Sequence, residues 1–204
     1  MATVVTSGPR ATSVQRTRQS ILTAARRHLI EIGYHRLSLE NVATDAGVTR
    51  VTIYRHFDSK LGLLDAIAED LNQRAGLATA MRETLRAADP VSAFTGMIEQ
   101  LCRFWGSDPE VLRRLISLAA VDPEAKLVIA GRERWRYRQV GIAVKRLAKA
   151  DRLQRAFDVR QAIAVVGAAT SFPACDELAS RLRTGLTTLD RTLVPALGGV
   201  VRLD

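Results

Sequence analysis

The chain has 204 residues, 47% of them apolar, which is enough to bury a core in one or two domains and excludes a disordered chain. Six prolines and thirteen glycines leave little turn chemistry for a protein of many short strands, so the composition favours helices. No apolar stretch reaches the ~18 residues that a membrane crossing needs, and the first dozen residues lack a secretory signal, which predicts a cytoplasmic protein.

Basic residues outnumber acidic ones by 30 to 21, which gives a formal net charge of +9. The excess is densest in residues 1–60, which carry nine basic and four acidic side chains. A basic region of this kind indicates an acidic partner, of which nucleic acid is one.

The N-terminal segment predicts a flexible tail followed by one long helix. Residues 1–12 are small and polar without periodicity, so we expect the tail there. From residue 13 the spacing is helical, and Gly33 predicts the end of this helix because glycine tolerates a positive φ. The apolar residues that recur at steps of three and four are Ile21, Leu22, Ala25, Leu29 and Ile32.

Three Asp-Pro pairs predict helix starts further along the chain. Aspartate accepts hydrogen bonds from the free N–H groups of a first helical turn, and proline loses nothing at the first helical position. The pairs are Asp89-Pro90, Asp108-Pro109 and Asp122-Pro123. They predict helices over residues 90–105, 109–120 and 123–150, preceded by one over 58–87 and followed by two over 158–171 and 173–194.

Residues 38–57, SLENVATDAGVTRVTIYRHF, have the spacing of a helix-turn-helix. Gly47 supplies a left-handed turn, and Ala43 is small where the two helices cross. Ser38 and Thr49 are placed as the N-caps of the two helices. The apolar wedge between the helices consists of Val42, Ala46, Val48 and Ile53. A helix corner with no DNA-binding role has similar spacing. The residues on the exposed face of the second helix must therefore distinguish a DNA-binding motif from a purely structural corner.

The exposed face of the second helix is rich in hydrogen-bond donors. Arginine can bond both acceptors of a guanine, a valine methyl can meet a thymine methyl, and hydroxyl groups and lysine can bind phosphate. The segment from Thr49 to Phe57 contains no acidic residue, which favours DNA over a merely solvated face. Four cations on the preceding helix fit either phosphate contacts or ordinary solvated charge: Arg16, Arg18, Arg26 and Arg27.

This motif, continuing through Ser59-Lys60 to Leu63-Leu64, resembles the N-terminal domain of the TetR/AcrR family of transcriptional regulators. The resemblance covers about residues 13–70. It implies phosphate contacts for Ser38, Thr49, Thr52, Tyr54 and Lys60, and groove contacts for Arg50, Val51 and Arg55, with His56 in either role. Val51 departs from the small residue common at its position in the family, which should alter base preference rather than abolish binding.

The same resemblance implies an effector pocket among the C-terminal helices, although core packing is the simpler interpretation of each side chain. The candidates for its lining are Phe94, Met97, Leu101, Trp105, Trp135 and Tyr137. Four arginines alternate along the helix over 123–150, and we interpret them mainly as solvated charge, with a cation for an acidic effector as the alternative: Arg132, Arg134, Arg136 and Arg138.

The last two predicted helices carry apolar stripes that need a partner. Either both stripes pack into their own core, or they form the seam of a homodimer, as the placement of these helices in the TetR/AcrR family implies. The residues of that seam would be Val159, Ile163, Val166, Leu178, Leu182, Leu186, Leu189 and Leu193.

Catalytic chemistry finds no support in the sequence. It lacks G-x-S-x-G, a Gly-rich phosphate loop and H-E-x-x-H, and His28, His35 and His56 all lie in the N-terminal segment. We therefore expect no enzyme activity, catalytic residue, metal or cofactor. Cys102 and Cys175 form no CxxC pair, and we interpret them as buried, reduced, structural thiols.

These patterns predict an all-α protein of about nine helices. The tail over 1–12 would precede a three-helix helix-turn-helix domain over 13–60 and a helical effector-binding and dimerisation domain over 61–204. The resemblance implies a homodimeric repressor that binds double-stranded DNA at an inverted repeat and is released by a small, largely apolar effector of unknown identity. A DNA-binding or architectural protein without a small-molecule switch is the alternative.

Overall fold

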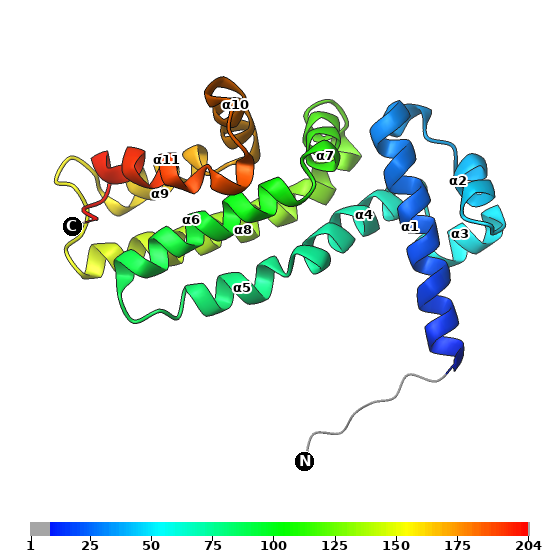
Figure 1. Ribbon diagram of the computed structural model, residues 1–204, viewed down its shortest axis with the longest axis horizontal. Coiled ribbons are helices and arrows are strands. Elements are labelled where there is room, and N and C mark those ends of the chain that lie inside the picture. The colour runs from blue at the N-terminus through cyan, green and yellow to red at the C-terminus, as the bar shows by residue number, and fades with distance from the viewer. Residues whose placement is uncertain (1–8, 204) are drawn as a thin grey trace, which may run out of the picture. The chain divides into compact units, whose positions relative to one another are not determined.

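The computed structural model describes residues 9–203, which form eleven α-helices and no strand beyond one isolated bridge (Figure 1). The chain divides into two compact units, one ending at Asp70 and the other beginning at Leu71. This division lies inside helix α4 (Lys60–Ala75), ten residues beyond the expected domain boundary. Residues 1–8 of the expected tail lie outside the described residues, and residues 9–12 already belong to α1 (Pro9–Arg36).

The first unit consists of α1, α2 (Leu39–Asp45), α3 (Arg50–Phe57) and most of α4. α1 leaves the helical conformation at Gly33, where φ is 76°, so the helix is interrupted where the sequence predicts its end. The core of this unit is built from the apolar positions that gave the helical periodicity. The largest fully buried side chains in it are Ile21, Leu29, Val42, Ile53 and Leu63.

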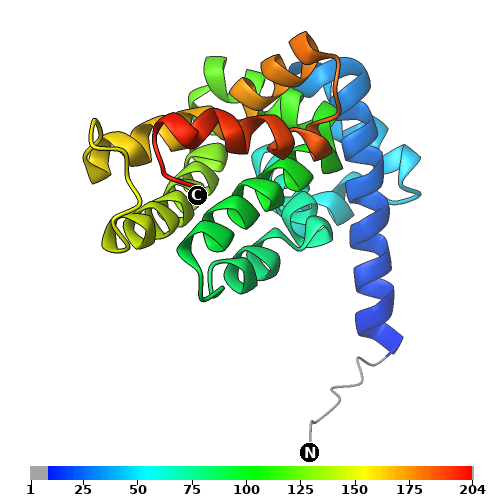
Figure 2. The same ribbon diagram turned by 60° about the vertical axis from the view of Figure 1, so that its left-hand side comes forward.

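The second unit is arranged around α6 (Pro90–Ser107). Helices before and after α6 in the chain pack against it, and Figures 1 and 2 both show α11 running beside it. Its neighbours are α5 (Leu77–Thr84), α7 (Pro109–Val121), α8 (Pro123–Lys149), α10 (Phe172–Leu182) and α11 (Asp190–Ala196). α9 (Val159–Ala169) packs on α8 and on α10. Among residues 9–203 no single helix is long and apolar enough to cross a membrane, whereas α9 and α10 pass that test only as a bent pair.

All three Asp-Pro pairs begin helices, as the sequence predicts. The Asp89 carboxylate accepts a hydrogen bond from the Ser92 backbone at 2.7 Å. Asp122 accepts two such bonds, from the first turn of α8. Asp108 makes no cap hydrogen bond with its side chain and is instead buried, 3.8 Å from the guanidinium of Arg74.

Two of the nine predicted helices are each divided in two, which is why residues 9–203 form eleven α-helices. The helix expected over 58–87 is interrupted at Gly76, whose φ of 61° separates α4 from α5. The helix expected over 173–194 ends at Leu182, because Arg183 adopts a left-handed conformation with φ of 51°. A 3₁₀ turn over 186–188 and then α11 follow.

The prediction of one continuous leucine stripe from Leu178 to Leu193 is therefore wrong. Leu186, Leu189 and Leu193 turn into the core of their own unit. The turn can lie close to α6 because Gly106 has no side chain, and a Cβ at that position would stand 2.4 Å from the methyl group of Thr187. Only Leu182 of this stripe is well exposed.

The interpretation of the four arginines of α8 as solvated is wrong for Arg136, which is 2% exposed. Its guanidinium donates to the Gly167 carbonyl at 2.8 Å and to the Thr170 hydroxyl at 3.1 Å, both beyond α8. It also pairs with the Glu133 carboxylate at 2.8 Å. Every part of this buried charge has a partner, so the guanidinium joins α8 to the end of α9.

We expect Arg136→Ala to lower the free energy of unfolding by about 1–3 kcal/mol, because buried acceptors on α9 lose their donor. Chemical denaturation measured by circular dichroism gives this value. Arg138→Ala, an exposed arginine of the same helix, is the matched control and should change stability by less than about 0.5 kcal/mol. Equal effects of the two substitutions would contradict the bonding role of Arg136.

Candidate nucleic-acid interface

The turn between α2 and α3 has the geometry that the sequence predicts. Gly47 adopts a φ of 67°, and the Val48 N–H donates to the Ala43 carbonyl at 2.9 Å across the turn. Val42, Ala43 and Ile53 are buried between the helices. This wedge fixes the angle at which α3 leaves α2, so the outer face of α3 is presented in one orientation.

The two predicted caps differ in the structure. The Thr49 hydroxyl accepts a hydrogen bond from the Thr52 backbone at 3.3 Å and lies 3.0 Å from the Thr52 hydroxyl. Ser38 occupies the N-cap position of α2 with extended backbone, yet its side chain makes no cap hydrogen bond. Thr49 therefore stabilises the start of α3, whereas the N-cap role of the Ser38 hydroxyl is not realised.

The outer face of α3 brings Arg50 and Tyr54 together. The Arg50 guanidinium donates to the Tyr54 hydroxyl at 2.9 Å and lies over its ring, 5.4 Å from the centroid. This hydrogen bond raises the pKa of Arg50. Val51 and Arg55 are exposed beside them, Val51 to 75% of its surface. The face therefore presents an apolar side chain between fixed cationic and hydroxyl groups.

Arg18 of α1 holds the far end of α3. Its guanidinium lies 4.6 Å from the centroid of the Phe57 ring and donates to the His56 carbonyl at 3.4 Å. A cation at the C-terminus of a helix also interacts favourably with the helix dipole. From the sequence alone, Arg18 fits either a phosphate contact or an ordinary solvated charge. Its positioning role could not be read from spacing, because its partner is 38 residues away.

Lys60 and His56 are half-buried at the base of the same face. The Lys60 ammonium lies 3.4 Å from the His35 carbonyl and 4.6 Å from the centroid of the Tyr34 ring, and burial lowers its pKa. Burial also lowers the pKa of His56, helped by the charges of Arg55 and Arg18. The lowered pKa favours the neutral form of His56, which can offer one donor and one acceptor.

Asp45 at the end of α2 is tied to α1. Its carboxylate accepts hydrogen bonds from Arg27 at 2.5 Å and lies 2.7 Å from Nε2 of His28, and these bonds lower its pKa. The carboxylate thus stays ionised at neutral pH, and the tie weakens as the pH falls through that lowered pKa. His28 has a structural role here, because it helps to join α1 to α2.

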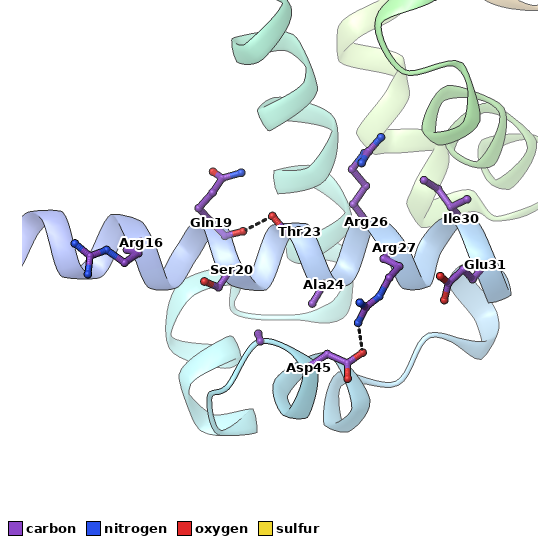
Figure 3. A pocket seen from close by; sticks show the side chains of 11 residues that line it. Arg16, Gln19, Ser20, Thr23, Ala24, Arg26, Arg27, Ile30, Glu31 and Asp45 are labelled. Atoms are coloured by element: carbon purple, nitrogen blue, oxygen red, sulfur yellow. Dashed lines mark hydrogen bonds and ion pairs between the residues drawn. The ribbon is translucent and has the colours of Figure 1, made fainter.

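An open hollow of about 740 Å³ lies along α1 and the end of α2 (Figure 3). Arg16, Arg26 and Arg27 line it together with Glu31 and Asp45. Both signs of charge are present, so the lining favours neither an anion nor a cation. None of its residues belongs to α3, so the hollow lies apart from the predicted groove contacts, although three of the α1 arginines that fit phosphate contacts or solvated charge line it.

The candidate pocket residues differ in how deeply they are buried. Phe94, Met97, Leu101 and Trp105 share the buried face of α6. Trp135 is half-buried, and Tyr137 packs against Gly167, where a Cβ would stand 2.2 Å from the ring.

Within residues 9–203, no three or more His, Cys, Asp or Glu side chains are arranged to hold a metal ion.

The fold and the α2–α3 corner together define a helix-turn-helix protein of the all-α class. Residues 21–67 match the family model of the tetR family of bacterial regulatory proteins. The chain is 34% identical over 90 residues to the transcriptional activator FasR of Mycolicibacterium smegmatis and 32% identical over 87 residues to the regulator TtgR of Pseudomonas putida. These matches cover 40% and 43% of this chain and 40% and 41% of those relatives, so the chain matches less than half of their length.

Solved structures show the same fold over nearly the whole chain. FadR of Bacillus halodurans superposes with a TM-score of 0.73 at 18% identity, covering 95% of this chain and 96% of that one. FadR of Bacillus subtilis, in complex with stearoyl-CoA, gives 0.72 at 17% identity and covers 89% and 98%. NalD, a repressor from Pseudomonas aeruginosa, gives 0.69 at 22% identity and covers 92% and 98%. Residues 21–67 therefore match the N-terminal domain of the tetR family of bacterial regulatory proteins, and the described chain as a whole has the fold of these solved structures.

We expect Gly47→Ala to destabilise the protein by about 1–2 kcal/mol, because the left-handed conformation of this turn strains any residue with a Cβ. The space itself is open, so the cost is conformational. Gly131→Ala is the matched control: it lies inside α8, where alanine should stabilise by about 0.5–1 kcal/mol. Thermal unfolding compares them, and a neutral Gly47→Ala would contradict the strained turn.

Proposed function

We propose that this protein is a sequence-specific regulator of transcription that binds double-stranded DNA through α3. The observation that carries this proposal is the outer face of α3, where Arg50 bonded to Tyr54 stands beside exposed Val51 and Arg55, with no acidic residue between Thr49 and Phe57. An arginine held by a neighbouring hydroxyl loses less side-chain freedom when it meets a guanine. The register on the duplex would be set by the phosphate contacts, which come from Ser38, Thr49, Thr52, Tyr54 and Lys60.

Direct selection tests this function. The purified protein is incubated with a random pool of double-stranded DNA, and bound molecules are sequenced. An enriched inverted repeat supports sequence-specific binding by a two-fold symmetric protein. No enrichment over the input pool would overturn the proposal.

We propose a homodimer whose seam lies on α9 and α10. The residues of this seam differ from those of the predicted leucine stripe. Val166, Leu186, Leu189 and Leu193 are already buried in their own unit. Val165 and Leu182 are instead exposed to 40% and 49% of their surfaces. Large apolar side chains left exposed on adjoining helices are candidates for contact with a second copy.

We also propose that the protein is a repressor released from DNA by a small, largely apolar effector held among the helices of the second unit. The buried aromatic face of α6 supplies apolar lining, and the B. subtilis FadR structure holds an acyl-CoA. α4 runs without a break across Asp70 and Leu71, so a tilt of this helix is a physical route between the units. Weakening DNA binding 100-fold requires a bias of about 2.7 kcal/mol.

A DNA-binding protein without a small-molecule switch is the alternative. A thermal-shift screen with apolar metabolites separates the two, since a ligand of the folded state raises its stability by mass action. Titration of a ligand found in this way, with and without the selected DNA, must then give two different affinities. Equal affinities in the two titrations, or a screen that finds no ligand, favour the DNA-binding protein without a small-molecule switch.

Replacement of Arg50 and of Lys60 by alanine should have different kinds of effect on DNA binding. Arg50→Ala should cost about 1–3 kcal/mol in binding to the selected site and relax sequence preference at one position of each half-site. Lys60→Ala should weaken binding to all sequences about equally, because phosphates carry no sequence information. Selection from a random pool with each variant measures both effects. A changed site with Lys60→Ala and an unchanged site with Arg50→Ala would reverse the assignment.

The proposed seam predicts that Val165→Glu combined with Leu182→Glu gives a folded monomer, because both side chains are exposed within one copy and would place charges in an apolar contact. Sedimentation velocity measures the mass, and circular dichroism checks the fold. Leu127→Glu, at a residue exposed to 74% on α8, is the matched control and should remain dimeric. A double variant that stays dimeric would place the seam elsewhere.

A further inference from the structure

One face of α8 carries a row of exposed cations. Their steps of four, seven and four residues place the side chains within an arc of about 60° around the helix, because each residue turns it by about 100°. The first and last positions are fifteen residues apart, which is about 22 Å at the helical rise. We call this set the α8 cation row, and it consists of Arg134, Arg138, Lys145 and Lys149.

The α8 cation row has no partner within residues 9–203. None of its four side chains forms an ion pair or a hydrogen bond there, and no acidic residue lies between Arg134 and Ala150. Two exposed arginines elsewhere in the second unit pair with a glutamate one turn away, as Arg103 does with Glu99 at 2.6 Å. The row instead places like charges four residues apart twice, which destabilises a helix. An anionic surface laid along α8 would remove this repulsion.

The fold itself does not use the α8 cation row. Two further cations of the same helix bond to other segments of the second unit. Arg136 bonds the end of α9, and Arg146 donates to the carbonyls of Leu85 and Ala88, which follow α5. These two arginines carry the structural role of basic residues on α8, so the four of the row remain available to another molecule.

Apolar side chains share this face of α8. Ile142 lies inside the row and is 46% exposed, and Leu127 lies on the same side of the helix and is 74% exposed. α8 contains no Ser, Thr or Asn, which proteins use beside cations to bind DNA phosphates. A lipid surface accepts cations at its headgroups and apolar side chains just beneath them. The combination therefore favours a membrane surface over DNA.

We propose that the α8 cation row docks the protein on membranes that contain anionic phospholipids. The four cations would meet the lipid headgroups, while Ile142 and Leu127 would enter the interface beneath them. Four or more basic residues gathered on one helix are the pattern of surfaces that bind anionic lipids. The helix would lie along the surface, which requires no membrane-crossing segment. This partner is additional to DNA and does not depend on the proposed function.

The first test measures co-sedimentation of the full chain with vesicles at low salt. One set of vesicles is phosphatidylcholine alone, and the other is phosphatidylcholine with an equal amount of phosphatidylserine. We expect binding to the second set only, and we expect added salt to weaken it because exposed charges are screened. Equal binding to both sets, or binding to neither, would overturn the proposal.

Neutralisation of the α8 cation row should remove most of this binding. Each cation near an anionic surface strengthens binding about fivefold, so the four substitutions together should weaken it by ~10²–10³-fold. They are Arg134→Gln, Arg138→Gln, Lys145→Gln and Lys149→Gln. Because these side chains make no bonds within residues 9–203, the variant should fold, which circular dichroism checks.

A matched control removes the same net charge from exposed arginines of the second unit outside α8, and it should retain most of the vesicle binding. Its substitutions are Arg103→Gln, Arg113→Gln, Arg155→Gln and Arg181→Gln. Equal losses in the two variants would assign the binding to net charge alone and overturn the docking surface.

Ile142→Ser separates a membrane from DNA as the partner of the row. It should weaken vesicle binding severalfold and leave binding to the selected DNA site unchanged, and Leu127→Ser repeats the measurement at a more exposed residue. Arg50→Ala should do the reverse, which keeps failure of this proposal distinct from failure of the proposed function. If neutralisation of the row weakens binding to duplex DNA but not to vesicles, DNA is its partner and the membrane proposal is wrong.

Discussion

Burial of one face of α6 is the constraint on which the second unit depends. Phe94, Met97, Ile98 and Leu101 follow helical spacing and have essentially no exposed surface. Each such side chain contributes about 1.5–3 kcal/mol through the removal of apolar surface from water. Helices from both sides of α6 in the sequence must therefore pack on it, and short connections such as Asp108-Pro109 turn the chain back each time.

The polar groups of this core are satisfied by contacts that cross between helices. Arg136 of α8 and the indole N–H of Trp105 on α6 both bond the end of α9, Arg136 through the Thr170 hydroxyl and Trp105 through the Thr170 carbonyl at 3.1 Å. Unpaired, each buried group would cost about 1–3 kcal/mol. These bonds hold the end of α9 beside α6 and α8.

In the first unit, apolar burial and polar contacts between helices likewise fix the orientation of α3. The apolar wedge around Ile53 sets its angle, and Arg18 of α1 fixes its far end through Phe57 and His56. The bond between Arg27 and Asp45 ties α2 to α1. A rigid helix with a donor-rich outer face can present several side chains to a surface at once, because little freedom is lost on contact. The proposed DNA contact therefore depends on residues that would not themselves touch DNA.

The sequence by itself determined the local features of this protein. The Asp-Pro helix starts, the positive φ at Gly33 and Gly47, and the helix-turn-helix over 38–57 each depend on a few neighbouring residues whose conformational preferences are strong. Those preferences also made the family resemblance specific, because the steric requirements of the turn select residue types at fixed spacing.

Only the tertiary structure decided which faces were already occupied. Apolar spacing alone cannot distinguish a leucine that meets its own core from one that meets a second copy, so the sequence left the burial of Leu189 open. The break at Arg183 was not predicted. The burial of Arg136 and the hydrogen bond of Trp105 depend on partners tens of residues away. Such partners come together only when the helices pack, because no local preference encodes a distance across the core.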